Sequence, residues 1–215
     1  MDIVDPAVSE YVLAHCTPAD DLLRELAAET RETFPSSAGM QVSQDEGQFL
    51  TMLTQLTGAR RAVEVGVFTG YSSICIARGM PPGGHLLACD VSEEWTSIAR
   101  HYWKRAGLEE RIDLRIAPAL STLRALPADP VLDLAFIDAD KASYPLYYEE
   151  LITRLRPGGL LILDNVLLGG HVLDSAFQSD DDVAMRQMNE IIAVDDRADS
   201  VMLPVRDGIT LARKR

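Results

Sequence analysis

The stretch Leu132-Asp-Leu-Ala-Phe-Ile-Asp-Ala-Asp-Lys141 decides the fold, because a buried apolar strand in it runs directly into charged residues. Further along the chain, Leu160-Leu-Ile-Leu163 runs into Asp164-Asn165-Val166 in the same way. Consecutive parallel strands joined by a helix usually lie side by side, about 4.8 Å apart, so oxygen ligands at both strand ends can close on one ion. Asp138, Asp164 and Asn165 offer carboxylate and amide oxygens, which suit Mg²⁺, Mn²⁺ or Ca²⁺ rather than Zn²⁺. Acidic residues also commonly end strands without binding anything, but two matched strand ends favour the cation site.

Length and composition indicate one domain. The 215 residues are 47% hydrophobic, enough to fill a core, and no linker, repeat or low-complexity tract interrupts them. We therefore expect a single domain over residues 1–215, with an N-terminal helical cap (1–58) and an α/β core (59–215). The 3 cysteines, an odd number, provide no disulfide framework, and we expect Cys75 and Cys89 to be reduced and packed.

Charge and hydropathy limit the partners. The net charge is −13, and the only Lys/Arg cluster is Arg213-Lys-Arg215, so we expect no nucleic acid to bind. A small neutral molecule or a cation would meet no long-range repulsion. The longest apolar stretches fall far short of the roughly 20 residues that span a bilayer, and no signal-peptide pattern opens the chain. We expect a cytoplasmic protein that does not enter a membrane.

The N-terminal part has helical patterns. Apolar spacing predicts an amphipathic helix over 18–34. Ser43-Gln-Asp-Glu46 matches a capping box at the start of a second helix, and Gly58 suits its C-terminal cap.

From Arg61 onward strands and helices alternate. Strands are expected at 62–65, 85–89, 111–116, 132–137, 160–163, 200–204 and 209–212, with helices through 74–77, 95–103, 120–126, 144–155 and 183–194. Trp95 is expected on the buried face of its helix, and Pro157-Gly-Gly159 is expected to end the helix before the fifth strand. Arg206-Asp-Gly208 joins the last two strands as a hairpin, which makes one strand antiparallel. This alternation predicts a doubly wound α/β sheet.

A second set of residues describes a nucleoside site. The first strand ends in Glu64-Val-Gly-Val-Phe-Thr-Gly70, whose glycine spacing differs from the Gly-x-Gly-x-x-Gly pattern of a dinucleotide site. Glu64 would disfavour a nearby phosphate but tolerate a sulfonium or amino group. Asp90 ends the second strand, where a carboxylate can accept the ribose hydroxyls. S-adenosylmethionine is the common cofactor with this profile.

Several motifs together resemble those of the cation-dependent O-methyltransferases, which include the catechol and caffeoyl-CoA enzymes and their bacterial relatives. They are Gln48-Phe-Leu50, Glu64-Val-Gly-Val-Phe-Thr-Gly-Tyr-Ser72, Phe136-Ile-Asp-Ala-Asp-Lys141 and Asp164-Asn165-Val166. The resemblance covers about residues 38–212. It implies a class I methyltransferase fold, which is a Rossmann-like doubly wound sheet, mostly parallel with one antiparallel strand, plus N-terminal helices. It also implies S-adenosyl-L-methionine as donor and a divalent cation, usually Mg²⁺.

The resemblance assigns roles by position. It implies that Asp138, Asp164 and Asn165 hold the metal, and that Lys141 occupies the place of the lysine proposed as base in the catechol enzymes. It implies donor contacts from Met40, Val42, Glu64, Gly66, Val67, Ser72, Asp90, Ala119 and Asp140.

Three positions depart from the family pattern. Relatives often carry Thr where Val42 stands, and the animal catechol enzymes carry His-Trp where Ala139-Asp140 stands. Relatives also tend to carry Gly where Arg206 stands, so we expect Arg206 to alter the acceptor pocket.

These residues suggest a mechanism. A cation that chelates two vicinal oxygens would lower the pKa of one hydroxyl and hold it against the methyl group, and Lys141 would accept the proton. The expected acceptor is a small vicinal diphenol, such as a catechol, a hydroxycinnamoyl ester or an aromatic natural-product intermediate. Of Tyr144, Tyr147 and Tyr148, we expect one or two in the core and the rest on the surface. We expect His171 in a solvated loop.

Other readings remain open. The acceptor could be a hydroxylated uridine of tRNA, against which the net charge speaks, or the chain could bind S-adenosylmethionine without catalysis. An NAD-dependent oxidoreductase fails on glycine spacing. Spare apolar faces on the N-terminal helices favour a homodimer.

Overall fold

A single sheet of seven strands organises the molecule. The strands are β1 (Arg61–Val65), β2 (His85–Asp90), β3 (Ile112–Ile116), β4 (Leu132–Ile137), β5 (Leu155–Asp164), β6 (Ala198–Leu203) and β7 (Ile209–Lys214). In the computed structural model, which describes residues 4–215, their order is β3-β2-β1-β4-β5-β7-β6. Strands β1 to β5 are parallel, and β7 is antiparallel to both of its neighbours. The expected doubly wound sheet with one antiparallel strand is confirmed.

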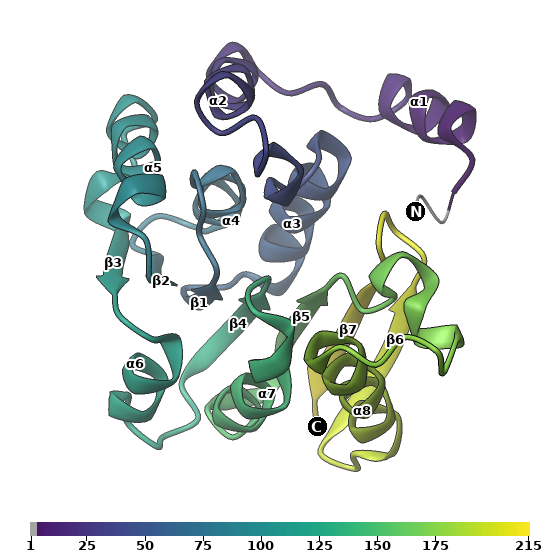
Figure 1. The fold of residues 1–215 in the computed structure, drawn as a ribbon. Helices are drawn as coiled ribbons and strands as arrows, with labels where there is room; N and C mark the ends of the chain where they lie inside the picture. Colours follow the sequence, from purple (N-terminus) through teal and green to yellow (C-terminus); the bar gives the residue numbers. More distant parts are fainter. Residues whose placement is uncertain (1–3) are drawn as a thin grey trace.

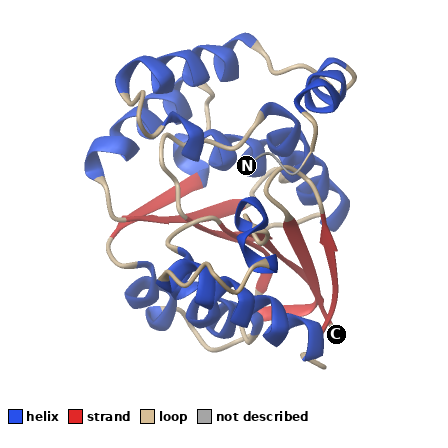
Figure 2. Ribbon diagram, turned by 45° about the vertical axis from the view of Figure 1, so that its right-hand side comes forward, coloured by secondary structure: helices blue, strands red, loops and turns tan. Residues whose placement is uncertain are grey.

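Helices cover both faces of the sheet (Figures 1 and 2). They are α1 (Pro6–Ala14), α2 (Asp21–Thr33), α3 (Gln44–Thr57), α4 (Tyr71–Gly79), α5 (Glu93–Arg105), α6 (Ala119–Ala125), α7 (Tyr144–Ile152) and α8 (Asp180–Val194). Short 3₁₀ helices occur at Ala38–Met40, Glu109–Arg111, Lys141–Ser143 and Leu168–Leu173. Helices α2 to α5 lie on one side of the sheet and α6 to α8 on the other (Figure 1).

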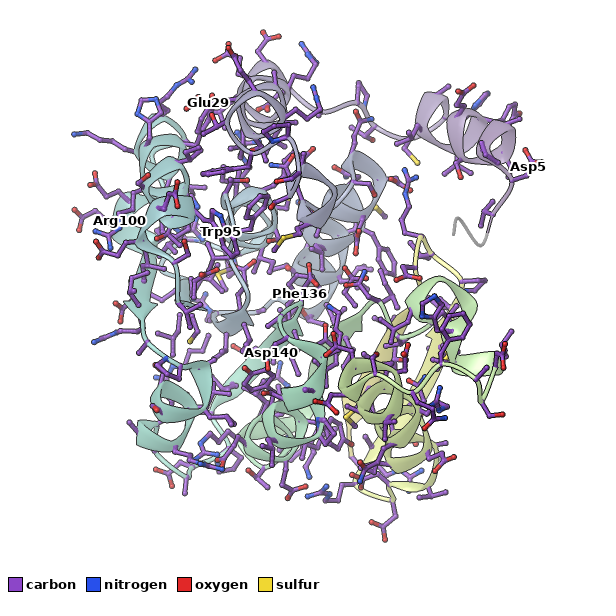
Figure 3. The ribbon with its side chains drawn as sticks, viewed as in Figure 1. Asp5, Glu29, Trp95, Arg100, Phe136 and Asp140 are labelled. Atoms are coloured by element: carbon purple, nitrogen blue, oxygen red, sulfur yellow. The ribbon has the colours of Figure 1, made fainter. Side chains whose placement is uncertain are left out.

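The two faces of the sheet form two apolar cores, as expected when successive side chains point to opposite faces. In β4, Leu134 and Phe136 face helices α2 to α5, whereas Ala135 and Ile137 face α6 to α8. Phe136 lies near the middle of the molecule, whereas Arg100 lies at its rim (Figure 3).

The register of the central strands places the functional candidates at one edge. Strands β4 and β5 pair directly, with Ile137 opposite Leu163, so that Asp138 and Asp164 leave the sheet side by side. Strand β1 lies on the other side of β4 and ends at Val65, where the Asp138 backbone N–H donates to the Val65 carbonyl at 2.8 Å. The strand order reverses between β1 and β4, and ligands of such sheets bind at that crevice.

The expected capping box at the start of α3 is wrong. Ser43 is the N-cap residue, but its side chain makes no capping bond and its hydroxyl donates instead to Asp45 Oδ1 at 2.7 Å. A complete capping box occurs at the start of α8, between Ser179 and Asp182.

Two other expectations need correction. The Pro157-Gly-Gly159 segment lies inside β5, and α7 already ends at Ile152. The pairing of β4 with β5 shifts register there, between Leu132 and Leu134, which accommodates a proline that cannot donate to the ladder. All three tyrosines of α7 are buried, so none belongs to the surface.

His171 was expected in a solvated loop, but it lies in the 3₁₀ helix Leu168–Leu173, with its Nδ1 3.0 Å from Asp182 Oδ1. Other local predictions agree with the structure. Gly58 adopts the left-handed C-cap conformation, with φ 60°. Cys75 and Cys89 are buried and free. Among residues 4–215, no helix is both long enough and apolar enough to cross a membrane.

Candidate active site

A cavity of about 1170 Å³ lies at the carboxyl ends of β1, β2, β4 and β5. Its wall includes all but one of the site residues expected from the sequence: Met40, Val42, Gly66, Val67, Ser72, Asp90, Ala119, Asp138, Asp140, Lys141, Asp164 and Asn165. The structure thus brings residues from six separate segments to one cavity. The exception, Glu64, is buried beneath the wall.

The two neighbouring strand ends form the corner of the cavity that holds the residues expected to bind a metal ion. Asp138 follows β4, Asp164 ends β5, and Asn165 comes next with φ 57°, a left-handed conformation that Asn tolerates better than most residues. Asp164 is only 2% exposed, and its Oδ1 accepts a hydrogen bond from the Asn165 backbone N–H at 2.6 Å. Burial, together with the nearby charges of Glu46 and Asp138, raises the pKa of Asp164 well above its usual value.

This corner contains two carboxylates and one amide of the expected ligand set. Across residues 4–215, no group of three His, Cys, Asp or Glu side chains is arranged as a ready metal cluster. The expected set relies on Asn165 for its third oxygen. Its all-oxygen chemistry fits a hard cation such as Mg²⁺.

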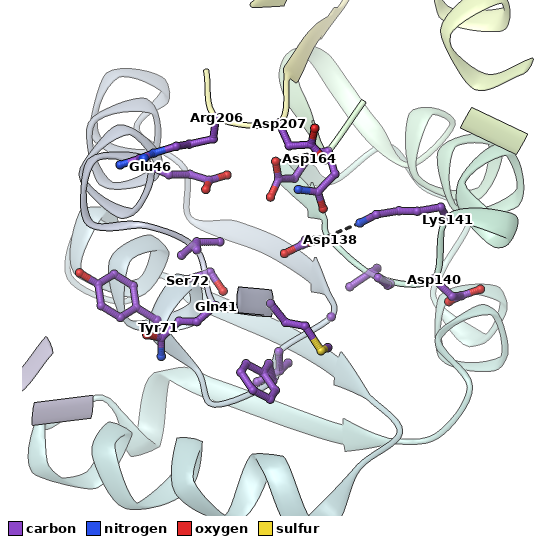
Figure 4. Close-up of a pocket in the computed structure, with 18 of the residues that line it drawn as sticks. Gln41, Glu46, Tyr71, Ser72, Asp138, Asp140, Lys141, Asp164, Arg206 and Asp207 are labelled. Carbon is purple, nitrogen blue, oxygen red and sulfur yellow. Dashed lines mark hydrogen bonds and ion pairs between the residues drawn. The ribbon is translucent and has the colours of Figure 1, made fainter. Parts of the chain in front are cut away.

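Lys141 lies on the same wall and points toward Asp138 (Figure 4). It is held by two partners. Its Nζ donates to Asp138 Oδ1 at 3.0 Å and to Tyr144 Oη at 2.8 Å. The Tyr144 oxygen is also 3.1 Å from the Ile137 carbonyl and 3.0 Å from the Asp164 carbonyl, either of which can accept its proton. Tyr144 therefore ties Lys141 to the ends of both strands. This contact was not predicted from the sequence, although the spacing of three residues could have indicated it, since such residues face each other across a helical turn.

The glycine turn after β1 forms the opposite part of the wall. Gly66 has φ 93°, and a Cβ atom there would lie 1.8 Å from the Asp138 carbonyl oxygen, so no other residue fits without movement of the chain. The turn lets the end of β1 approach the segment that carries Asp138.

Asp90 holds this turn in place. Its Oδ2 accepts hydrogen bonds from the Val67 and Phe68 backbone N–H groups, both at 2.9 Å. Its Oδ1 accepts from Val91 and Ser92, at 2.7 and 2.8 Å. A carboxylate has about four acceptor positions, so backbone groups already use those of Asp90. Its contact with ribose hydroxyls stays a prediction.

Glu64 sits behind the wall and is fully buried. Ser73 donates a hydrogen bond to Glu64 Oε2, whereas Oε1 has no hydrogen-bond partner among the described residues. Burial raises the pKa of Glu64 to about 8, which favours the neutral carboxylic acid near neutral pH. Glu64 does not line the cavity, and its contact with the donor stays a prediction.

Sequence reasoning missed several residues of the wall. Glu46 is 3% exposed and faces Asp164, but its place in a Ser-x-x-Glu pattern indicated only a cap. Trp95 lines the cavity rather than the core and meets the Phe68 ring edge-on, at 5.3 Å between centroids. Tyr147 donates to Asp140 Oδ1 at 2.6 Å and so fixes an expected donor contact.

Arg206 reaches across the mouth of the cavity. It lies in the hairpin between β6 and β7 and forms a two-pronged ion pair with Asp45 at the start of α3, with its Nε 3.0 Å from Oδ1 and 3.1 Å from Oδ2. The guanidinium, together with the Ser43 hydroxyl, holds the pKa of Asp45 below its usual value despite the opposing effect of burial. Arg206 therefore joins the hairpin to the N-terminal cap beside the cavity, as part of its lining.

Acidic side chains dominate the cavity. The charged lining residues in the described part of the chain are Asp45, Glu46, Asp90, Asp138, Asp140, Asp164, Asp181 and Asp207 against Lys141 and Arg206. Both basic residues are already paired with carboxylates. The cavity therefore favours a cationic ligand over a phosphate-bearing one.

Comparisons with known proteins agree with this geometry. A family model described as O-methyltransferase matches residues 14–215. The chain is 40% identical to caffeoyl-CoA O-methyltransferase 2 of Zea mays over 81% of this chain and 70% of that protein. It is 36% identical to catechol O-methyltransferase domain-containing protein 1 of Mus musculus, over 98% of this chain and 80% of that protein.

A solved structure shows the same likeness. The O-methyltransferase of Bacillus cereus, solved in complex with S-adenosylhomocysteine, superposes with a TM-score of 0.87 at 33% identity, over 97% of each chain.

Proposed function

The chain belongs to the O-methyltransferase family, and on that premise we propose that it methylates one hydroxyl of a small aromatic vicinal diol with the help of a divalent cation. It is an S-adenosylmethionine-dependent enzyme of the caffeoyl-CoA and catechol type. The cation, the acceptor and the roles of individual residues are the proposed part.

One observation carries the proposal. Asp138, Asp164 and Asn165 leave two neighbouring strands at the edge of the same cavity that the glycine turn of β1 lines. A methyl donor at the turn and an acceptor at the strand ends would share one enclosed space. Methyl transfer is an in-line displacement, so holding both reactants in that space supplies much of the catalysis.

The residues at the strand ends fit a divalent cation. Burial and the neighbouring charges of Glu46 and Asp138 raise the pKa of Asp164 well above its usual value, so an ionised Asp164 is under electrostatic strain in this corner. A cation held by these two carboxylates and Asn165 would relieve it. When bound, the cation supplies Lewis-acid chemistry that makes an acceptor hydroxyl more acidic.

Lys141 is the proposed proton acceptor. Its Nζ lies on the cavity wall beside Asp138, and in the neutral amine form it can take the acceptor proton at that atom. Asp138 and Tyr144 fix the direction of the amine, so the proton would move along a defined line. Tyr147 holds Asp140, which keeps the donor side of the same wall in place.

The acidic lining suits the donor. A sulfonium carries a positive charge, which the carboxylates of this cavity attract. The same lining repels a polyanion, so we expect a small acceptor rather than tRNA. Binding of bulk tRNA at low salt, measured by filter retention, should stay at background level.

The acceptor class can be tested with isomeric phenols. We expect methylation of catechol-type 1,2-diols and at least about a hundredfold lower kcat/KM for resorcinol and phenol, which cannot place two oxygens on one cation. Equal rates for catechol and resorcinol would contradict chelation of the acceptor.

We further propose a homodimer. Apolar side chains of the N-terminal helices stay exposed within the chain, among them Tyr11 (65%), Met52 (49%) and Leu56 (79%). Light scattering coupled to size exclusion should give twice the chain mass. A monomer at micromolar concentration would contradict this.

A further inference from the structure

Glu46 is a buried carboxylate, one oxygen of which is left without a hydrogen bond by the described fold. It lies in the first turn of α3, where the capping box that would have used it does not form. The side chain is 3% exposed, and its Oε1 has no hydrogen-bond partner among the described residues. A buried polar atom without a partner costs stability, so such an atom in a cavity wall points to a ligand.

The Glu46 side chain points toward the corner of the cavity formed by Asp138, Asp164 and Asn165. Its carboxyl group faces that of Asp164 from the opposite side of the cavity, and Asp138 lies nearby (Figure 4). The two facing side chains come from different parts of the chain, α3 in the N-terminal cap and β5 in the core. Like charges in such a buried corner repel each other strongly unless a cation lies between them.

No basic side chain of the described cavity wall is hydrogen-bonded to Glu46 or Asp164. Among the described lining residues, the basic groups are Lys141 and Arg206. Lys141 Nζ is bonded to Asp138 and Tyr144, and Arg206 is bonded to Asp45. The Lys141 charge acts on Asp164 from nearby, but neither basic residue is bonded to Glu46 or Asp164.

We propose that, when a cation binds, Glu46 is drawn in and supplies a fourth protein oxygen to the divalent cation site of Asp138, Asp164 and Asn165. Without the cation, no three acidic side chains of the described residues are arranged to hold one. The inference rests on the cation of the proposed function and adds to it a ligand from the N-terminal cap. Mg²⁺ and Mn²⁺ prefer about six oxygens, so four from the protein leave two positions, the number that a vicinal diol needs. Cation binding would also fasten α3 to the sheet, which closes the cavity on the side of Glu46.

Manganese binding to the protein alone tests this without turnover. Free Mn²⁺ is followed by its EPR signal during titration of the protein without donor or acceptor. Glu46→Gln keeps the shape but removes the charge, and Glu46→Asp keeps the charge but shortens the reach. We expect both to bind Mn²⁺ at least about tenfold more weakly than the unaltered protein, a loss typical of removing a carboxylate from a metal site.

Two further variants separate a ligand from a general effect of charge. Asp181→Asn removes a carboxylate from the same cavity wall, one that accepts a hydrogen bond from the Ala142 N–H. It should bind Mn²⁺ within about twofold of the unaltered protein. Asp164→Asn, which alters a proposed ligand, should lose affinity at least as strongly as Glu46→Gln.

The outcomes distinguish this inference from the proposed function. If both Glu46 variants bind Mn²⁺ tightly and Asp164→Asn does not, the proposed role of Glu46 is overturned, whereas the cation site itself is not. Unchanged binding by Asp164→Asn, or no Mn²⁺ binding by the unaltered protein, would overturn the cation site itself and this inference with it.

A second measurement covers the case in which the Glu46 variants do not fold. In the unaltered protein, Mn²⁺ should slow amide hydrogen exchange in the first turns of α3, because the cation would tie Glu46 to β5. Exchange that slows around residues 138–141 and 164–165 but not around residues 44–50 would overturn the inference.

Discussion

Lys141 has the contacts that a positioned base requires. Its Nζ has Asp138 and Tyr144 as fixed partners, and its side chain is only 14% exposed. A solvated surface lysine would have neither. The geometry therefore supports a role in proton transfer, which a substitution can separate from donor binding.

We expect Lys141→Ala to lower kcat by about 10²–10⁴-fold, the usual contribution of a general base. Donor affinity should stay within about twofold, because Lys141 lies at the strand ends where we propose that the acceptor binds. Isothermal titration with S-adenosylhomocysteine and steady-state kinetics measure the two quantities. A parallel loss of donor affinity and kcat would argue for a structural role instead.

At the scale of single residues, strand ends were the most predictable part of the site. The sequence placed Asp138, Asp164 and Asn165 together because parallel strands end at one edge of a sheet. It did not reveal Glu46, since the same Ser-x-x-Glu spacing is also the pattern of a cap. Whether such a glutamate caps a helix or lines the cavity depends on the residues that face it, and these are set by the tertiary fold.

At the scale of elements, the turn after β1 is the most tightly constrained segment of the site. Gly66 combines φ 93° with a Cβ position that would overlap the Asp138 carbonyl. Gly83 offers a matched control, since it has φ 78° but nothing within 4 Å of its Cβ position.

We expect Gly83→Ala to lower the free energy of unfolding by about 1 kcal/mol, the cost of a positive φ alone. Gly66→Ala should cost at least about 2 kcal/mol more, since β1 and the Asp138 segment must also move apart. Urea unfolding of both variants measures the difference. Equal losses would show that the close approach of the turn to Asp138 is not important for stability.

Element boundaries were less predictable than element types. The alternation of strand and helix gave the sheet, but Pro157-Gly-Gly159 looked like a helix stop and lies inside β5. A proline is admitted there because the register of β4 and β5 shifts beside it, a feature of strand pairing that local pattern does not show. The ion pair of Arg206 with Asp45 was likewise invisible, since its partners are 161 residues apart.

At the scale of the whole molecule, buried acids make stability depend on pH. Burial raises the pKa of Glu64 from 4.5 to about 8, so the folded state binds more protons than the unfolded state between these values. The contribution of Glu64 to the free energy of unfolding is fully present below pH 4.5 and is lost as pH rises through about 8. Glu46 and Asp164, whose pKa values are also raised, act in the same direction.

We therefore expect the metal-free protein to lose stability between about pH 5 and pH 8, within the range set by the Glu64 values of 4.5 and about 8. Glu64→Gln should reduce this loss, by an amount on the order of a few kcal/mol at most. Urea unfolding at both pH values measures it. A pH dependence of stability identical in the variant and the unaltered protein would contradict the account of Glu64.

The central claim is that two neighbouring strand ends hold a divalent cation beside the methyl donor. Methylation of a catechol in thoroughly chelated buffer, before and after excess Mg²⁺ is added, tests it most directly. We predict that chelation lowers the rate at least about a hundredfold, that Mg²⁺ restores it, and that S-adenosylhomocysteine binding persists throughout. Full turnover in the chelated buffer would contradict the claim.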